Sequence, residues 1–141
     1  MILSKWLIAF VAVYGGLGGI LFDYVVPATA RQHQGNPAWP PHAKFHNGQT
    51  MMLGVLNMIL SLAVLFVSPS PTLSTLLVAA ALADIYFASM LLAPIFPGTA
   101  WSDPEFDDVN PRPFGIPIQK LLSTAATGLI IVAVVIAVVQ R

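Results

Sequence analysis

The sequence of 141 residues contains no cysteine and few charged residues. The lack of cysteine excludes disulfides, thiolate catalysis, iron–sulfur clusters and cysteine zinc sites. Charged residues make up 9% of the chain, whereas a soluble domain carries ~25%. The formal net charge of zero gives no argument for nucleic acid as a partner. Walker, dinucleotide-binding and haem-attachment motifs are also absent, which argues against ATP-driven transport and ordinary redox catalysis.

Hydrophobic residues make up 57% of the chain and gather in four runs. The runs lie at residues 2–26, 49–67, 73–96 and 117–139, and because the second helix could start before its run, we place the four spans at 2–26, 42–67, 73–96 and 117–139. Each is long enough to cross a hydrocarbon core of ~30 Å at ~1.5 Å per residue. Too little polar chain is left for a second, soluble domain. The sequence therefore predicts an all-α integral membrane protein, a single antiparallel four-helix bundle.

The first run has a second interpretation as a secretory signal, because Lys5 lies near its start and residues 28–30 (Ala-Thr-Ala) resemble a cleavage site. Its apolar stretch is longer than the ~7–15 residues of a signal core. Asp23 and Tyr24 are also more polar than the residues that usually precede a cleavage site. We therefore expect the first run to be retained as a span.

Two polar segments, residues 27–48 and 97–116, fall on one side of the membrane if all four runs span it. They contain all three histidines and most of the acidic residues. We expect the two segments to form a lid on one face of the bundle. Glu105 is expected to close this lid by pairing with Lys44, Arg31 or a loop histidine.

Asp84 is the most informative single residue, because it lies near the middle of the third run. An ionisable group at that depth costs ~2.5–3.5 kcal/mol on insertion scales and usually has a partner. It is either a proton donor or acceptor, or a structural hydrogen-bonding group that pairs with Asn57 or Tyr14. At ~100° per residue, Asn57 shares a helix face with His46. The sequence therefore predicts that Asp84, Asn57 and His46 line one polar slot.

His42 and His46 are spaced by four residues, which makes them neighbours on a helix. Three interpretations stay open: a metal pair completed by Glu105 or Asp103, an acid–base pair, or a surface role. The glutamate of a His-Glu-x-x-His motif is missing. We therefore predict a site without metal or cofactor, with both histidines as catalytic candidates.

Four glycines lie in the middle of the first run. Gly15 and Gly19 form a G-x-x-x-G pair, which lets helix backbones approach closely. Gly16 and Gly19 share a face with Asp23, so the same stripe could instead leave a smooth groove for a flat lipophilic ligand. Close packing and ligand binding both remain open, and Asp23 is a further candidate site residue.

Three segments are distinctive: residues 36–49 (Asn-Pro-Ala-Trp-Pro-Pro-His-Ala-Lys-Phe-His-Asn-Gly-Gln), 96–99 (Phe-Pro-Gly-Thr) and 103–105 (Asp-Pro-Glu). With them the chain resembles a family of small, uncharacterised four-span membrane proteins, which we associate with fungi and their biosynthetic gene sets. The overall plan is also distantly similar to DoxX-like four-helix proteins. The resemblance implies a role in making lipophilic natural products such as terpenoids, and it supplies no catalytic residues.

The favoured function is an intramembrane enzyme that cyclises or isomerises a lipophilic substrate by acid or hydrogen-bond catalysis, with a pericyclic (Diels–Alder type) closure as one form. Such chemistry needs a shaped apolar pocket, one well-placed donor and no cofactor. The alternative is a non-catalytic accessory or small-molecule carrier protein. Membrane lipid is the expected surrounding, in the endoplasmic reticulum if the source is eukaryotic, and a homo-oligomer is left open. The catalytic candidates are Asp84, His46, Asn57, His42, Asp23 and Glu105.

Overall fold

The computed structural model describes residues 1–67 and 69–140, so Ser68 in the expected connection between the second and third runs lies outside the described residues, as does Arg141. The described chain is helical, with no strand in these ranges. Four helices are long and apolar enough to cross a membrane, which indicates a multi-pass membrane protein. Their bounds are Ile2–Val25, Pro41–Phe66, Leu73–Ile95 and Ile118–Val139, each within one residue of a predicted span.

The first of these helices combines α1 (Ile2–Ile20) with a π-helical turn, η1 (Leu21–Val25). The second is α3 (Pro41–Phe66), and the third joins α4 (Leu73–Leu92) to a 3₁₀ turn at Ala93–Ile95. The fourth is α5 (Ile118–Val139). The shorter helices are α2 (Pro27–Ala30) and 3₁₀ turns at Pro104–Phe106 and Pro113–Gly115.

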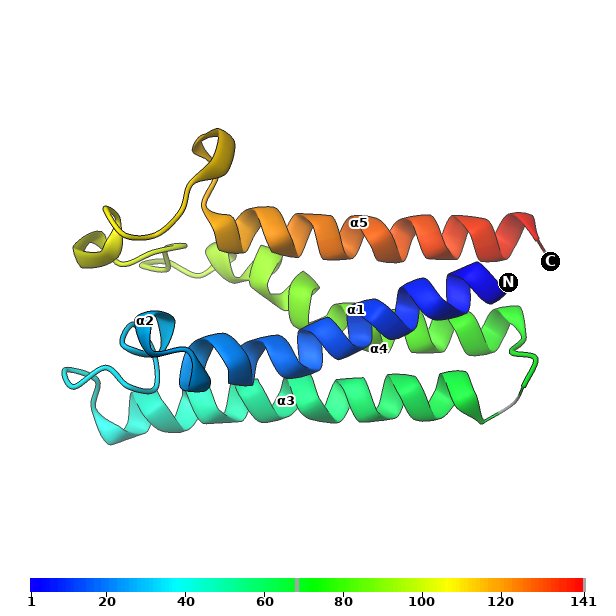
Figure 1. Ribbon diagram of the computed structural model, residues 1–141, viewed down its shortest axis with the longest axis horizontal. Coiled ribbons are helices and arrows are strands. Elements are labelled where there is room, and N and C mark those ends of the chain that lie inside the picture. The colour runs from blue at the N-terminus through cyan, green and yellow to red at the C-terminus, as the bar shows by residue number, and fades with distance from the viewer. Residues whose placement is uncertain (68, 141) are drawn as a thin grey trace.

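The long helices lie side by side, with α1 and α4 at the centre. Helix α1 packs against α3, α4 and α5, and α4 packs against α1, α3 and α5. Figure 1 shows α3 and α5 on opposite sides of this pair, with both chain ends at one end of the molecule. The first loop (residues 26–40) and the second loop (residues 96–117) lie together at the other end. The polar segments therefore meet at one end, as the sequence predicted.

Small residues fill the contacts between the helices. Gly16 of α1 meets α3 so closely that a Cβ atom there would lie 2.5 Å from Cβ of Met58. Gly15 similarly faces the Phe87 ring of α4. The Ser61 hydroxyl of α3 donates a hydrogen bond to the carbonyl of Ala79 in α4, at 2.9 Å. Gly15 and Gly16 of the glycine stripe therefore serve close packing, which is typical of helix contacts in membranes.

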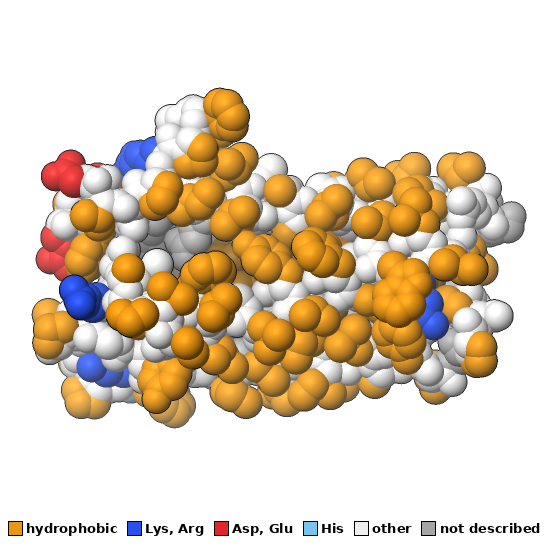
Figure 2. Space-filling model, viewed as in Figure 1, with side chains coloured by type: hydrophobic (Ala, Val, Ile, Leu, Met, Phe, Trp, Pro, Cys, Tyr) orange, Lys and Arg blue, Asp and Glu red, His pale blue; other side chains and the backbone are white. Residues whose placement is uncertain are grey.

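The outer surface of the helices is apolar. Large hydrophobic side chains such as Phe10, Leu56, Val78 and Ile131 are exposed on α1, α3, α4 and α5 in turn. Figure 2 shows hydrophobic side chains along the length of the molecule and most of the charged ones at the loop end. A soluble monomer rarely exposes so extended an apolar surface, so the exterior suits a lipid environment.

The last turn of the first helix departs from a regular α-helix. The amide of Val26 donates to the carbonyl of Leu21 at 2.8 Å, five residues back, and Pro27 then starts α2. A π-helical turn inserts one extra residue into the turn and rotates the side chains that follow it. Such turns are frequent at functional sites. Here the turn carries Asp23.

Candidate functional site

A cavity of about 310 Å³ lies at the loop end, between α1, α4 and α5. Both loops contribute to its wall, whereas no described residue of α3 does. Its volume lies at the lower end of the ~300–1,000 Å³ range of ligand pockets. The residues that line it are Tyr14, Gly18, Gly19, Phe22, Asp23, Thr29, Gln32, His33, Tyr86, Phe87, Met90, Trp101, Ser102, Asn110, Pro111, Arg112, Pro117, Ile118, Gln119, Leu122 and Ser123.

The membrane side of the cavity is mostly apolar and aromatic. The ring of Tyr14 stacks on the buried ring of Phe87, with centroids 5.4 Å apart. A Cβ atom at Gly19 would lie 3.0 Å from the Tyr86 hydroxyl, whereas one at Gly18 would meet nothing within 4 Å. Within the described chain, the Tyr86 hydroxyl has no hydrogen-bond partner. The cavity can therefore take an apolar ligand and offer it a phenol as donor.

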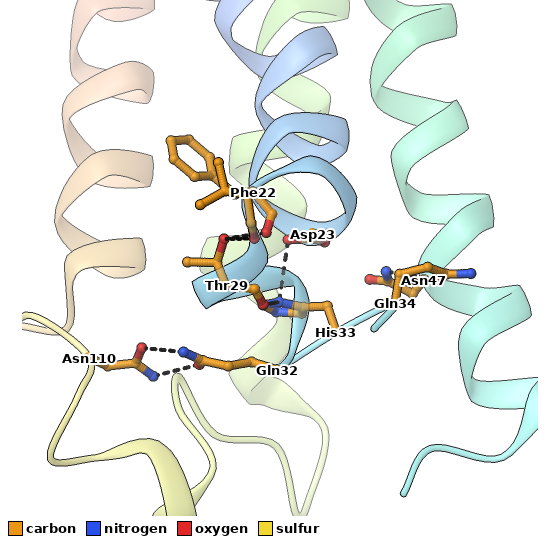
Figure 3. Close-up of polar contacts among 9 residues, drawn as sticks. Phe22, Asp23, Thr29, Gln32, His33, Gln34, Asn47 and Asn110 are labelled. Carbon is orange, nitrogen blue, oxygen red and sulfur yellow. Dashed lines mark hydrogen bonds and ion pairs between the residues drawn. The ribbon is translucent and has the colours of Figure 1, made fainter. Parts of the chain in front are cut away.

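Asp23 and His33 lie beside each other in the cavity wall (Figure 3). Oδ1 of Asp23 lies 3.6 Å from Nδ1 of His33, and the two side chains are 14% and 26% exposed. Nδ1 of His33 also lies 3.0 Å from the carbonyl oxygen of Thr29. Because a carbonyl oxygen only accepts, Nδ1 carries the proton in this bond. In the neutral ring, Nε2 then holds the lone pair that can accept a proton.

Local hydrogen bonds hold this pair in place. The Thr29 hydroxyl donates to the carbonyl of Phe22, which ties α2 back onto the π-helical turn. The amide of Gln34 donates to the carbonyl of Asp23 at 3.2 Å. The chain therefore reverses direction at Pro27 and returns His33 to Asp23, ten residues later in sequence.

The two loops are joined by an amide pair over the cavity. Nε2 of Gln32 donates to Oδ1 of Asn110, and Nδ2 of Asn110 donates to Oε1 of Gln32, both at 2.9 Å (Figure 3). Asn110 also donates to the Ser102 hydroxyl at 2.8 Å. In Figure 3 the Gln34 side chain reaches Asn47 of α3, with an Nδ2–Oε1 distance of 3.3 Å. Side-chain amides therefore link the first loop both to the second loop and to α3.

Among the residues predicted from the sequence, Asp23 lines the cavity and Asp84 does not. Oδ1 of Asp84 accepts a hydrogen bond of 2.7 Å from the Thr127 hydroxyl of α5. The expected partner, Asn57, lies on α3, which packs on the Ala79 side of α4. Asp84 is five residues from Ala79, or ~140° around the helix, and therefore faces α5 instead.

The other candidates also lie outside the cavity lining. His42 and His46 are exposed on α3, and Asn57 is half-buried there with no hydrogen bond within the described ranges. The expected slot of Asp84, Asn57 and His46 is therefore not brought together. Glu105 is exposed and forms no ion pair with any described residue.

The expected ion pair of Glu105, which would close the lid, does not form. The ion pair of the second loop instead joins Oδ1 of Asp107 to the Arg112 guanidinium at 2.6 Å, within that loop. Arg112 comes five positions after Asp107, so a local turn can bring them together. Glu105 lies in the 3₁₀ turn Pro104–Phe106 and is directed into solvent. The contact between the loops is made by neutral amides.

Sequence reasoning missed His33, Gln32, Asn110 and Tyr86. The available signal for His33 was the proline between it and Asp23, which allows the chain to fold back. No periodic pattern points to the amide pair, because its two members are 78 residues apart. Among residues 1–67 and 69–140, no cluster of three or more histidine, aspartate or glutamate side chains could hold a metal ion.

The model of a family of unknown function, DUF6640, matches residues 7–132. The chain belongs to this family. The DUF6640 match contains every cavity residue, from Tyr14 to Ser123, so the cavity lies wholly in the part of the chain that defines membership. No curated protein and no solved structure matches the chain.

Proposed function

We propose that the chain is a cofactor-independent intramembrane enzyme that isomerises or cyclises a lipophilic small molecule by proton transfer. The observation that carries this proposal is the Asp23–His33 pair in the wall of a mostly apolar cavity. A carboxylate beside Nδ1 stabilises the imidazolium that forms when Nε2 takes up a proton. The pair is thus suited to a general base that later returns its proton as a general acid.

Tyr86 supplies the second part of the chemistry. Its hydroxyl lines the same cavity and can donate to a carbonyl oxygen of the substrate. In a substrate whose carbonyl is conjugated to a double bond, His33 would remove a proton from the γ carbon, so that the C–H bond breaks and its electrons move through the double bond to the carbonyl oxygen. The Tyr86 hydroxyl would stabilise that enolate. Return of the proton to a different carbon shifts the double bond, with no change of oxidation state.

The same groups support a cyclisation. A hydrogen bond from Tyr86 polarises a carbonyl and so lowers the barrier of a pericyclic closure, while the cavity holds the chain folded. We further propose that the four helices form an antiparallel bundle in the bilayer, with the endoplasmic reticulum as the location in a eukaryotic source. The two loops would act as the lid. The resemblance to proteins of fungal biosynthetic gene sets suggests terpenoid-like substrates.

Solvent deuterium provides the test. The protein in lipid nanodiscs is incubated in D₂O with a panel of prenyl aldehydes and ketones of increasing length, and deuterium uptake is followed by mass spectrometry. His33→Ala should reduce exchange by ~10²–10⁴-fold, because it removes the base. Asp23→Asn should also reduce it, whereas Asp84→Asn is the matched control outside the cavity. Equal exchange by His33→Ala and the unaltered protein would refute the proposal.

A pair of glycine variants separates catalysis from carriage. Gly18→Leu places a side chain in the cavity, whereas Gly128→Leu adds the same side chain to α5, outside the cavity lining. A Cβ atom at either glycine meets nothing within 4 Å, so both variants should fold. Only Gly18→Leu should block both ligand binding and exchange. If the unaltered protein binds the probes in the cavity and exchanges none of them, the chain is a carrier.

A further inference from the structure

His42 and His46 converge on each other at the start of α3, away from the cavity. Their Nε2 atoms lie 3.1 Å apart, and the ring centroids are 4.5 Å apart with the planes at 75°. Residues four apart lie on the same side of a helix, so the first two turns of α3 hold both rings. Both side chains are exposed, and the ring of Phe45 contacts each of them.

Gln49 fixes the orientation of the His46 ring and, when that ring is neutral, its tautomer. Nδ1 of His46 lies 3.2 Å from Oε1 of Gln49. An amide oxygen only accepts, so Nδ1 of His46 donates in this bond and Nε2 holds the lone pair. That lone pair faces Nε2 of His42. Metal-ligating histidines typically donate their other ring N–H to an oxygen acceptor in this way.

The spacing of the two nitrogens suits a shared metal ion. A divalent zinc ion binds imidazole nitrogen at ~2.0–2.1 Å, so two such bonds at a tetrahedral angle place the nitrogens ~3.3–3.4 Å apart. The observed 3.1 Å requires only a small rotation of either ring. In the metal-free protein one proton between the nitrogens would form the contact. On metal binding the proton of the neutral His42 ring would move from Nε2 to Nδ1, so that the Nε2 lone pairs of both rings face the ion.

We propose that His42 and His46 form a two-imidazole chelating site for a divalent transition-metal ion, with Gln49 as the residue that positions His46. No third histidine, aspartate or glutamate of the described chain joins the pair, so water would complete the coordination. Imidazole suits copper, nickel and zinc, and the affinity for Cu²⁺ should exceed that for Zn²⁺. This site is separate from the cavity and does not depend on the proposed proton transfer.

The test is titration of the full chain in nanodiscs with Cu²⁺ and then Zn²⁺, by calorimetry and by electron paramagnetic resonance of the copper form. We expect one site, with nitrogen hyperfine splitting from two imidazoles. His42→Ala or His46→Ala should each leave one ring and weaken Cu²⁺ binding by at least tenfold. Gln49→Ala should weaken it by ~10–100-fold while both nitrogens stay in the spectrum.

The matched control keeps the number of histidines and changes their spacing. The double variant Ala43→His/His46→Ala holds histidines at adjacent positions, which do not face each other on a helix. It should bind Cu²⁺ no better than His46→Ala. The proposal is overturned if this double variant binds as tightly as the unaltered protein, or if either single variant does.

Discussion

The contact of Gly16 with Met58 gives a sharp test of how α1 and α3 are held together. A Cβ atom at Gly16 would lie 2.5 Å from Cβ and 2.7 Å from Sδ of Met58, and both distances are below the 3.0 Å that real Cβ atoms keep. Gly16→Ala therefore forces the helices apart or displaces Met58. Overpacking of this kind costs ~1–3 kcal/mol.

Gly18→Ala, two residues along the same helix, is the matched control. Alanine is favoured over glycine in a helix by up to ~1 kcal/mol, and both variants gain this stabilisation. A Cβ atom at Gly18 meets nothing within 4 Å, so Gly18→Ala carries no contact cost. The difference in the free energy of unfolding between the two variants should therefore be ~1–3 kcal/mol, with Gly16→Ala the less stable.

The free energy of unfolding of both variants is measured in mixed micelles. A denaturing detergent is titrated and tryptophan fluorescence is followed. Adding Met58→Gly removes all three atoms nearest to the new methyl group, so the double variant should recover part of the loss in a double-mutant cycle. If Gly16→Ala is as stable as Gly18→Ala, α1 and α3 do not approach as closely as described. A coupling energy of zero with Met58→Gly would contradict the assignment of the clash.

Four further predictions concern polar contacts. Asn110→Ala removes the amide pair, and each lost hydrogen bond should lower the stability by ~0.5–1.5 kcal/mol. Backbone hydrogen exchange should rise in both loops, while the amides of α3 stay protected. Unchanged exchange would show that the loops are held by other contacts. A double-mutant cycle of Asp84→Leu with Thr127→Val should give a coupling near ~0.6 kcal/mol, and below ~2 kcal/mol, in detergent unfolding. Asp84→Asn keeps the acceptor and should retain deuterium exchange, so a folded Asp84→Asn variant without exchange would make Asp84 catalytic. Arg112→Gln breaks an exposed ion pair with Asp107 worth ~0–1 kcal/mol, and a larger loss of stability would indicate a role beyond that pair.

The positions of the helices could be predicted because each depends on the length of one apolar run. Each long helix begins and ends within one residue of its predicted span. The meeting of the two loops at one end also follows from an even number of long helices. The π-helical turn at Leu21–Val25 could not be predicted, because it depends on how α2 folds back after Pro27.

The direction in which polar side chains point was harder to predict than their position along each helix. Asp84 lies within α4 as expected. The small residues that pack α1 and α3 against α4 set the rotation of α4 about its axis. This rotation turns Asp84 toward Thr127 of α5. Prediction of the candidate site met the same difficulty. Asp23 could be proposed from its own span, whereas His33 becomes visible only when the first loop is folded.

The Gln32–Asn110 amide pair also constrains the order in which the molecule can be completed during synthesis. Gln32 is made 78 residues before Asn110, so its side chain stays hydrated until the third helix and most of the second loop have followed. Closing so long a segment is entropically costly, and it comes after the local helices have formed. A nascent chain that stops after α4 would keep the α1–α3–α4 contacts and lack the walls of the cavity that the second loop and α5 provide. The cavity is therefore completed only after the second loop and the start of α5 have been made.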